Sequence, residues 1–180
     1  RSRGLGDVYK RQPIRHTLHI YRQAVGCLIR VYEESWEELS RIVNLQKRFN
    51  AAEHLVHETK KNHARFAFDR HFPKMPSYLR RAAIQHALGA VSSYQTRLGL
   101  WEKGELKGKP KLVCENHAMP VFYNKNMYKE DAPKNAKYPK GMNPCKDNIR
   151  WLKLYQNNDW VWIPVRLRKT DIDYINKYWG

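Results

Sequence analysis

The chain has 180 residues, of which 34 are Lys or Arg and 17 are Asp or Glu, so its formal net charge is +17. A surplus of this size favours a polyanionic partner. Phosphate backbones are the commonest one, because binding to them releases condensed counterions. Hydrophobic residues make up 42% of the chain, which excludes a disordered basic tail and allows one domain or two small ones.

The sequence also argues against a membrane or disulfide-linked protein. No stretch approaches the roughly 18 consecutive apolar residues of a membrane-spanning helix, and the chain does not open on a secretory signal. Cys27, Cys114 and Cys145 are odd in number and form no C-x-x-C pair, which argues against a disulfide framework and a zinc ribbon. We therefore expect a cytoplasmic protein with reduced thiols and no membrane partner.

The first dozen residues are unusual. Residues 2–12 read SRGLGDVYKRQ and resemble the translation of a transposon-based sequencing adapter, in which GAT-GTG-TAT-AAG-AGA-CAG would encode Asp7 to Gln12. We expect residues 1–12 to be adapter-derived and exclude them from the fold prediction. Without their four basic residues and one acidic residue the net charge is +14, so the basic character remains. The alternative is a genuine basic N-terminal arm.

Residues 13–102 are predicted to form a helical domain. Apolar residues recur at steps of three and four, which is typical of an amphipathic helix. The predicted helices cover residues 17–43, 45–60 and 77–101. Pro73 and Pro76 exclude a continuous helix over residues 62–76, and Ser77 is the expected N-cap of the third helix.

Two clusters of titratable residues lie on these helices. The first consists of Glu33, Glu34, Glu37 and Glu38, and the second of Glu53, His54, His57 and Glu58. Adjacent glutamates on a helix are usually a solvated face rather than paired catalytic carboxylates. The second cluster lacks the H-E-x-x-H spacing, so we predict no metal ligation there.

Residues 103–180 are predicted to form a basic, β-rich domain that is truncated at its C-terminus. A lysine-rich, glycine-containing linker opens it at Lys103, and the helical period disappears there. Strands are expected at 112–115 and 121–128, a mobile loop at 129–147, a hairpin at 149–155 and 160–167, and a helix from 171 that Thr170 would cap. Pro164 lacks an amide proton, so its strand should lie at a sheet edge or carry a bulge. The expected fold is α+β, an N-terminal helical bundle followed by a small antiparallel sheet or partial barrel.

The basic and aromatic residues are candidates for nucleic-acid binding. Arg80 and Arg81 occupy the first turns of a helix, where they oppose its dipole. A phosphate or an acidic partner would explain them, and an exposed pair is the alternative. In the hairpin, rings alternate with cations on one face, a pattern that suits stacking on bases, unless both faces are covered and the tryptophans are core. The candidate residues are Arg80, Arg81, Lys107, Lys109, Lys111, Lys125, Lys153, Trp160, Trp162, Arg166 and Arg168.

Three segments resemble a known family. Phe68 to Tyr94, Pro120 to Tyr128 and Asn158 to Leu167 are similar to the N-terminal region of insertion-sequence transposase proteins of the TnpB/OrfB family, relatives of RNA-guided nucleases. The resemblance implies that the helices match a recognition lobe and the strands a neighbouring wedge, which together hold a guide-like RNA and its DNA target. It also implies that the catalytic RuvC-like domain, with its divalent metal (Mg²⁺) and zinc, belongs to a missing part of the parent. We expect neither a catalytic residue nor a cofactor in this fragment.

Two other readings stay open. One is a self-standing, non-enzymatic RNA- or DNA-binding module. The other is a transposase with a catalytic tyrosine, whose metal site needs two histidines around one residue. His16 and His19, like His54 and His57, are separated by two residues, so the spacing argues against it.

Overall fold

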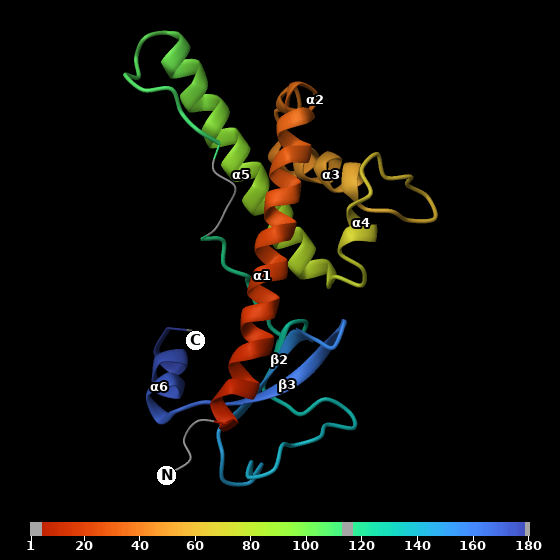
Figure 1. The fold of residues 1–180 in the computed structure, drawn as a ribbon, viewed down its shortest axis with the longest axis vertical. Helices are drawn as coiled ribbons and strands as arrows, with labels where there is room; N and C mark the ends of the chain where they lie inside the picture. Colours follow the sequence, from red (N-terminus) through yellow and green to blue (C-terminus); the bar gives the residue numbers. More distant parts are fainter. Residues whose placement is uncertain (1–4, 113–116, 179–180) are drawn as a thin grey trace. The chain divides into compact units, whose positions relative to one another are not determined.

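The computed structural model describes residues 5–112 and 117–178, with side chains from residue 12 onward (Figure 1). The fold is α+β, as the sequence predicts, with helices first and a small antiparallel sheet near the end of the chain. The chain divides into two compact units. The helical unit is Leu18–Val121, and the sheet unit combines the described residues of 1–17 with those of 122–180.

The first predicted helix is two helices in the structure. α1 spans Leu5–Glu34 and α2 spans Trp36–Ser40. Ser35 breaks the helix with φ −95° and ψ 10°, although its backbone N–H still donates to the Val31 carbonyl at 3.0 Å. The apolar spacing continues across this break, with Tyr32 and Leu39 both buried. The sequence period therefore predicts one helix where the backbone makes two.

α3 spans Leu45–Val56 and ends four residues earlier than predicted. It begins at Asn44, whose side chain accepts a hydrogen bond from the Lys47 N–H at 2.9 Å. At its end the Asn62 side-chain amide donates to the carbonyls of His54 and His57 at 2.8 and 2.7 Å. These bonds satisfy carbonyls that a longer helix would have used, so the chain can turn at this point.

α4, Phe68–His71, is a single turn inside the segment that was expected to be irregular, and α5 spans Ser77–Glu102. The N-cap of α5 is Pro76, so the prediction of Ser77 as the cap was wrong; Ser77 is the first helical residue. The core of the helical unit lies on the predicted apolar faces. Its buried members include Tyr21, Val25, Leu28, Ile29, Tyr32, Leu39, Ala52, Val56, Phe68, Leu79, Ile84, Ala87 and Val91.

The sheet has the strand order β1-β2-β3 and is antiparallel throughout. β1 is Tyr128–Lys129, β2 is Ile149–Gln156 and β3 is Asp159–Arg166. Asn157 and Asn158 close the predicted hairpin with φ values of 52° and 59°. Two consecutive positive values are typical of a two-residue type I′ turn, in which Asn is well tolerated. Among the described strands β3 pairs only with β2, so Pro164 lies in an edge strand as expected.

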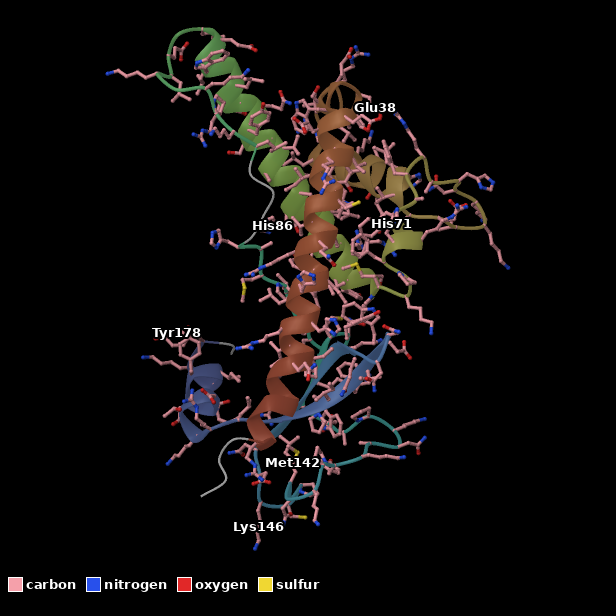
Figure 2. The ribbon with its side chains drawn as sticks, viewed as in Figure 1. Glu38, His71, His86, Met142, Lys146 and Tyr178 are labelled. Atoms are coloured by element: carbon pink, nitrogen blue, oxygen red, sulfur yellow. The ribbon has the colours of Figure 1, made fainter. Side chains whose placement is uncertain are left out.

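The predicted strands and loop before the hairpin agree with the structure only in part. Most of the expected strand at 112–115 lies outside the described residues. The strand expected at 121–128 is wrong, because the Tyr123 carbonyl accepts from the N–H groups of both Met127 and Tyr128, at 2.8 and 3.1 Å, and closes a turn instead. Residues 130–148 contain no helix or strand, and this loop carries Met142 and Lys146 (Figure 2).

α6 spans Lys169–Tyr178. It begins before the predicted cap, Thr170, and the Asp171 carboxylate instead accepts from the Arg168 N–H at 2.9 Å. Within the described part of the chain, the helices are too short or too polar to cross a bilayer.

Candidate nucleic-acid interface

The register of the β2–β3 hairpin decides which side chains share a face. Lys153 lies opposite Trp162, Tyr155 opposite Trp160, and Trp151 opposite Pro164. Side chains that are directly opposite one another in an antiparallel pair project from the same face. The predicted alternation is therefore confirmed, with rings and Lys153 on one face of the hairpin.

Burial divides the tryptophans of this face into two groups. Trp151 is 2% exposed and Trp160 is 8% exposed, and their rings pack edge-on against Tyr138 and Tyr155 at centroid distances of 5.3 and 5.4 Å. Trp162, by contrast, is partly exposed. The sequence left open whether the hairpin tryptophans are core or surface residues. Trp151 and Trp160 are core, and Trp162 reaches the surface.

Two ammonium groups lie beside the Trp162 indole. Lys129 Nζ is 4.8 Å and Lys153 Nζ is 5.9 Å from the ring centroid. Both distances are within the range of a cation–π contact. We call Lys129, Lys153 and Trp162 the Trp162 surface. Lys129 was not among the predicted binding residues. Only the pairing of β1 with β2, which sets Lys129 opposite Trp151, brings it to this face.

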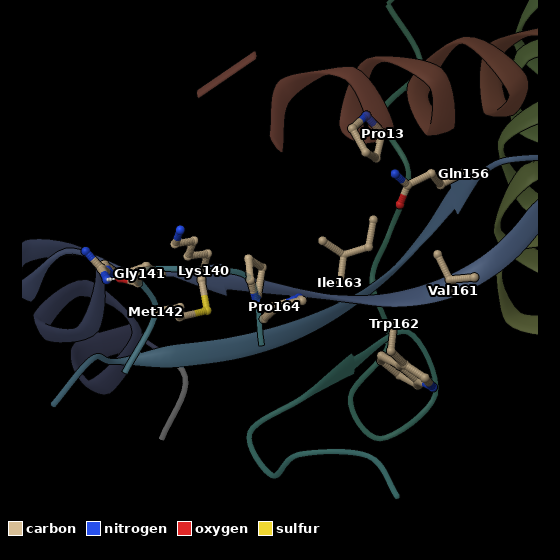
Figure 3. A pocket seen from close by; sticks show the side chains of 11 residues that line it. Pro13, Lys140, Gly141, Met142, Gln156, Val161, Trp162, Ile163 and Pro164 are labelled. Atoms are coloured by element: carbon tan, nitrogen blue, oxygen red, sulfur yellow. Dashed lines mark hydrogen bonds between the residues drawn. The ribbon is translucent and has the colours of Figure 1, made fainter. Parts of the chain in front are cut away.

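A hollow runs beside Trp162 along β3 (Figure 3). It has a volume of about 500 Å³ and is lined by β3 residues, including Trp162 and Pro164, and by residues 139–142 of the loop before β2. Trp162 and Ile163 project from opposite sides of the strand. Lys140 also lines the hollow.

Two predicted binding arginines instead hold the local fold together. The Arg166 guanidinium donates to the Gly141 carbonyl at 2.9 Å and pairs with the Asp147 carboxylate. Arg168 donates to both carboxylate oxygens of Asp171, at 3.1 and 2.9 Å. These hydrogen bonds lower the pKa of Asp171 and raise the pKa of Arg168. Both guanidinium charges are therefore locally balanced by carboxylates.

The four predicted binding lysines outside the hairpin are exposed. Lys107, Lys109 and Lys111 lie in the segment that follows α5, in the helical unit, and Lys109 Nζ is 5.2 Å from the Trp101 ring centroid. Lys125 lies in the sheet unit, in the turn before β1, with φ of 64°.

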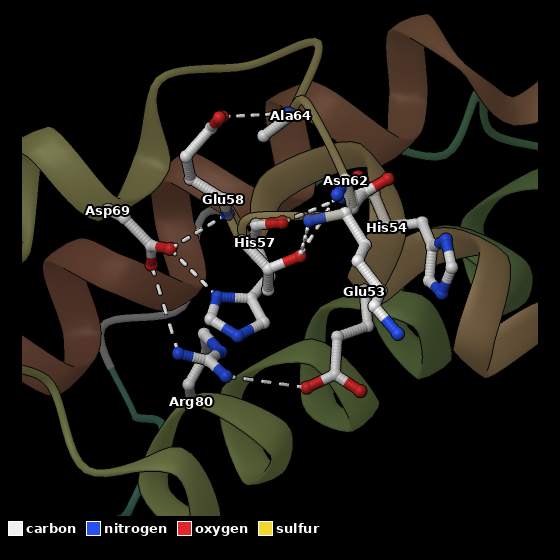
Figure 4. A network of polar contacts seen from close by, with 10 residues as sticks. Glu53, His54, His57, Glu58, Asn62, Ala64, Asp69 and Arg80 are labelled. Atoms are coloured by element: carbon white, nitrogen blue, oxygen red, sulfur yellow. Dashed lines mark hydrogen bonds and ion pairs between the residues drawn. The ribbon is translucent and has the colours of Figure 1, made fainter.

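Arg80, in the helical unit, is a buried side chain rather than a surface cation. It is 7% exposed, and its two terminal nitrogens lie 3.6 Å from a Glu53 carboxylate oxygen and 3.8 Å from an Asp69 carboxylate oxygen (Figure 4). Arg81 is more exposed and lies over the Phe49 ring at 5.1 Å. The alternative of an exposed arginine pair is wrong for Arg80, because the Glu53 and Asp69 carboxylates enclose it.

Side chains of the second titratable cluster, at the end of α3, also contact partners from other segments. His57 Nδ1 is 2.8 Å from Asp69, and the Glu58 carboxylate accepts from the Ala64 N–H at 2.8 Å, a bond that lowers the pKa of Glu58 (Figure 4). In residues 5–112 and 117–178, no three His, Cys, Asp or Glu side chains gather as a metal site would require.

Two glutamates of the acidic cluster on α1 and α2 share one arginine partner. Glu34 and Glu38 pair with Arg65 at 3.9 and 3.0 Å, and all three side chains are largely exposed. This geometry matches the solvated face that was expected.

The fold and this interface define an α+β protein with a basic aromatic surface on its sheet. The chain belongs to the Aq_aa04 family, whose model matches residues 6–140. The match includes the helices α3, α4 and α5 and ends before the β2–β3 hairpin. No curated protein and no solved structure matches the chain.

Proposed function

We propose that this chain binds nucleic acid and that the Trp162 surface contacts an unpaired stretch of the strand. The observation that carries this proposal is the position of the Lys129 and Lys153 ammonium groups, 4.8 and 5.9 Å from the centroid of a partly exposed indole. Rings stack on bases at about 1–3 kcal/mol each, and lysines neutralise the neighbouring phosphates.

The charge of the sheet unit supports this proposal. Residues 122–180 contain twelve Lys and Arg against six Asp and Glu. Several of these acids already pair with arginines, as Asp147 does with Arg166 and Asp171 with Arg168. The lysines therefore carry most of the uncompensated charge, and such a field attracts a polyphosphate chain.

The resemblance to TnpB/OrfB proteins supports a more specific proposal. In it, the chain is a non-catalytic, nucleic-acid-binding portion of a transposase or RNA-guided DNA endonuclease, with DNA or a guide-like RNA as partner. A reading frame that continues after Gly180 into spaced Asp, Glu and Asp residues and paired C-x-x-C motifs would support this parentage. A stop codon at that position in the source genome would instead favour a self-standing module.

A titration of single-stranded RNA and DNA at several salt concentrations tests the proposal. Affinity should fall steeply with salt, because bound phosphates release counterions. Replacing both Lys129 and Lys153 with Gln should reduce the slope of log K against log salt by about 1.4, which is about 0.7 for each phosphate that is no longer neutralised. A flat salt response of the unmodified chain would exclude the proposal.

The matched control is the double replacement of Lys134 and Lys137 with Gln. These lysines are exposed in the same unit, on the loop between β1 and β2, so the change in net charge is identical. Equal weakening of binding in the two double variants would show that only overall charge matters and that the Trp162 surface is not a specific contact.

A further inference from the structure

A second pocket opens in the helical unit at the point where α5 begins. It has a volume of about 510 Å³ and lies between the first turns of α5 and the end of α3 with its following turn. Its lining includes Glu53, His57, Lys61, Ser77, Arg80 and Arg81. We propose that this pocket binds a phosphate group of a nucleic acid.

The N-terminus of α5 is suited to an anion. This helix is 26 residues long, its N-cap is Pro76, no side chain caps it, and its first turn contains no acidic residue. The first N–H groups of a helix lack intrahelical partners and carry a partial positive charge. Such an end is stabilised by an anion, and several nucleotide-binding folds hold phosphate groups at a helix N-terminus in this way.

Arg80, which lines the same pocket, is incompletely hydrogen bonded. Its ion-pair distances to Glu53 and Asp69, 3.6 and 3.8 Å, are longer than hydrogen bonds. Its Nε is buried and has no hydrogen-bond partner among the described residues. Buried donors without partners are costly, and a guanidinium suits a ligand that presents several acceptor oxygens.

The charge balance of the pocket also favours an anion. Lys61, Arg80 and Arg81 are cationic, and Glu53 is the acidic residue in the lining. The Glu53 carboxylate is already shared between the two arginines, at 3.6 Å from Arg80 and 3.8 Å from Arg81. Asp69 also lies 3.8 Å from Arg80, so the three cations exceed the two neighbouring carboxylates by one positive charge. Ser77 is a neighbouring hydroxyl donor at the α5 N-terminus.

This inference deepens the proposed function, on which it rests for the identity of the phosphate carrier. The phosphate is either a terminal monoester or an internal phosphodiester of the strand. The pocket itself belongs to the helical unit, whereas the Trp162 surface belongs to the sheet unit. Inorganic phosphate can therefore test the pocket even if the chain does not bind nucleic acid.

The experiment uses the full chain and two pairs of matched variants. Lys61→Gln removes a pocket cation, and Lys60→Gln removes the exposed neighbour that does not line the pocket. Ser77→Asp places a carboxylate at the α5 N-terminus, and Ser93→Asp places one at an exposed site farther along the same helix.

The probes are inorganic phosphate, followed by NMR titration at constant ionic strength, and an oligonucleotide with either a 5′-phosphate or a 5′-hydroxyl, followed by fluorescence anisotropy. Lys61→Gln and Ser77→Asp should each weaken phosphate binding about fivefold. Ser77→Asp should also raise Tm, because an acid at this end complements the helix dipole. A variant that is more stable yet binds phosphate less well cannot be explained by misfolding.

Each outcome has a defined meaning. A preference for the 5′-phosphate that Lys61→Gln abolishes and Lys60→Gln preserves supports a terminal phosphate. Equal weakening of both oligonucleotides by Lys61→Gln, beyond the effect of Lys60→Gln, supports an internal phosphodiester. Identical behaviour within each variant pair, with inorganic phosphate and with both oligonucleotides, overturns the pocket. Loss of oligonucleotide binding alone, with phosphate binding intact, contradicts the proposed function and not the pocket.

Discussion

The Asp69 carboxylate lies 3.8 Å from the buried Arg80 guanidinium and joins α4 to α5. The same carboxylate contacts His57 Nδ1 at 2.8 Å and accepts from the Glu58 N–H at 3.0 Å. Removing one partner of a buried pair leaves the other charge uncompensated. Because Asp69 is 28% exposed, Asp69→Asn should lower the free energy of unfolding by about 1–3 kcal/mol, less than for a fully buried pair. Urea denaturation measures this change.

The control for Asp69→Asn is an ion pair on the surface. Glu37 and Arg41 are close, but their side chains are 85% and 74% exposed. Exposed pairs contribute about 0–1 kcal/mol. Glu37→Gln should therefore change stability by less than Asp69→Asn, and equal effects of the two variants would contradict the stabilising role of the network around Arg80.

The two hairpin tryptophans should respond differently to replacement by leucine. Trp160 is 8% exposed, so Trp160→Leu should destabilise the chain by about 2–3 kcal/mol because the smaller side chain packs less well. Trp162 is partly exposed, so Trp162→Leu should weaken single-strand binding by about 1–3 kcal/mol with little effect on unfolding. Thermal unfolding and filter binding of both variants measure the two effects. Unfolding of Trp162→Leu to the same extent as Trp160→Leu would place both rings in the core.

The stability of the helical unit should decrease at alkaline pH because of the buried Tyr32. Burial, together with the nearby Glu53 and Cys27, raises the pKa of Tyr32 well above its ordinary value. The folded state therefore holds the phenol neutral, so this stabilisation is complete below the ordinary tyrosine pKa of about 10 and is lost as pH rises above it. Urea denaturation at pH 7 and above pH 10 should show this loss.

The variant Tyr32→Phe separates the ionisation of Tyr32 from other effects of alkaline pH on stability. At pH 7 it should cost about 1 kcal/mol, because the hydroxyl donates to the Ala52 carbonyl at 3.3 Å. Above pH 10 the difference from the unmodified chain should shrink or reverse. Tyr174→Phe, at a residue that is 67% exposed, is the control; a parallel response of both variants would argue against burial as the cause.

The turn between β2 and β3 depends on asparagine at a positive φ. Asn158 has a φ of 59°, which costs a β-branched residue about 1–2 kcal/mol. Asn158→Val should lower the stability of the chain by that amount, and Asn158→Gly should leave it within about 0.5 kcal/mol. Thermal unfolding followed by tryptophan fluorescence measures both. Asn148→Val, at an exposed asparagine outside the positive-φ residues, is the control and should have little effect.

Local sequence patterns were sufficient for most of the elements. Steps of three and four between apolar residues predicted the buried faces of α1 and α5, and the alternation around Asn157 and Asn158 predicted the hairpin almost to the residue. Some of these predictions were wrong because a side chain from another segment satisfies the backbone. The end of α3 is an example, because Asn62 caps its carbonyls from a turn several residues away.

The sequence by itself determined the order of helices and strands, the basic character of the chain and the face of β3 that carries the tryptophans, because each follows from composition or from a local period. Only the tertiary structure decided which of these charged groups are paired with carboxylates. Arg80 is enclosed by Glu53 and Asp69, and Arg166 is paired with Asp147, 19 residues away. Burial and charge compensation depend on contacts between segments that are distant in sequence, and no local period records them.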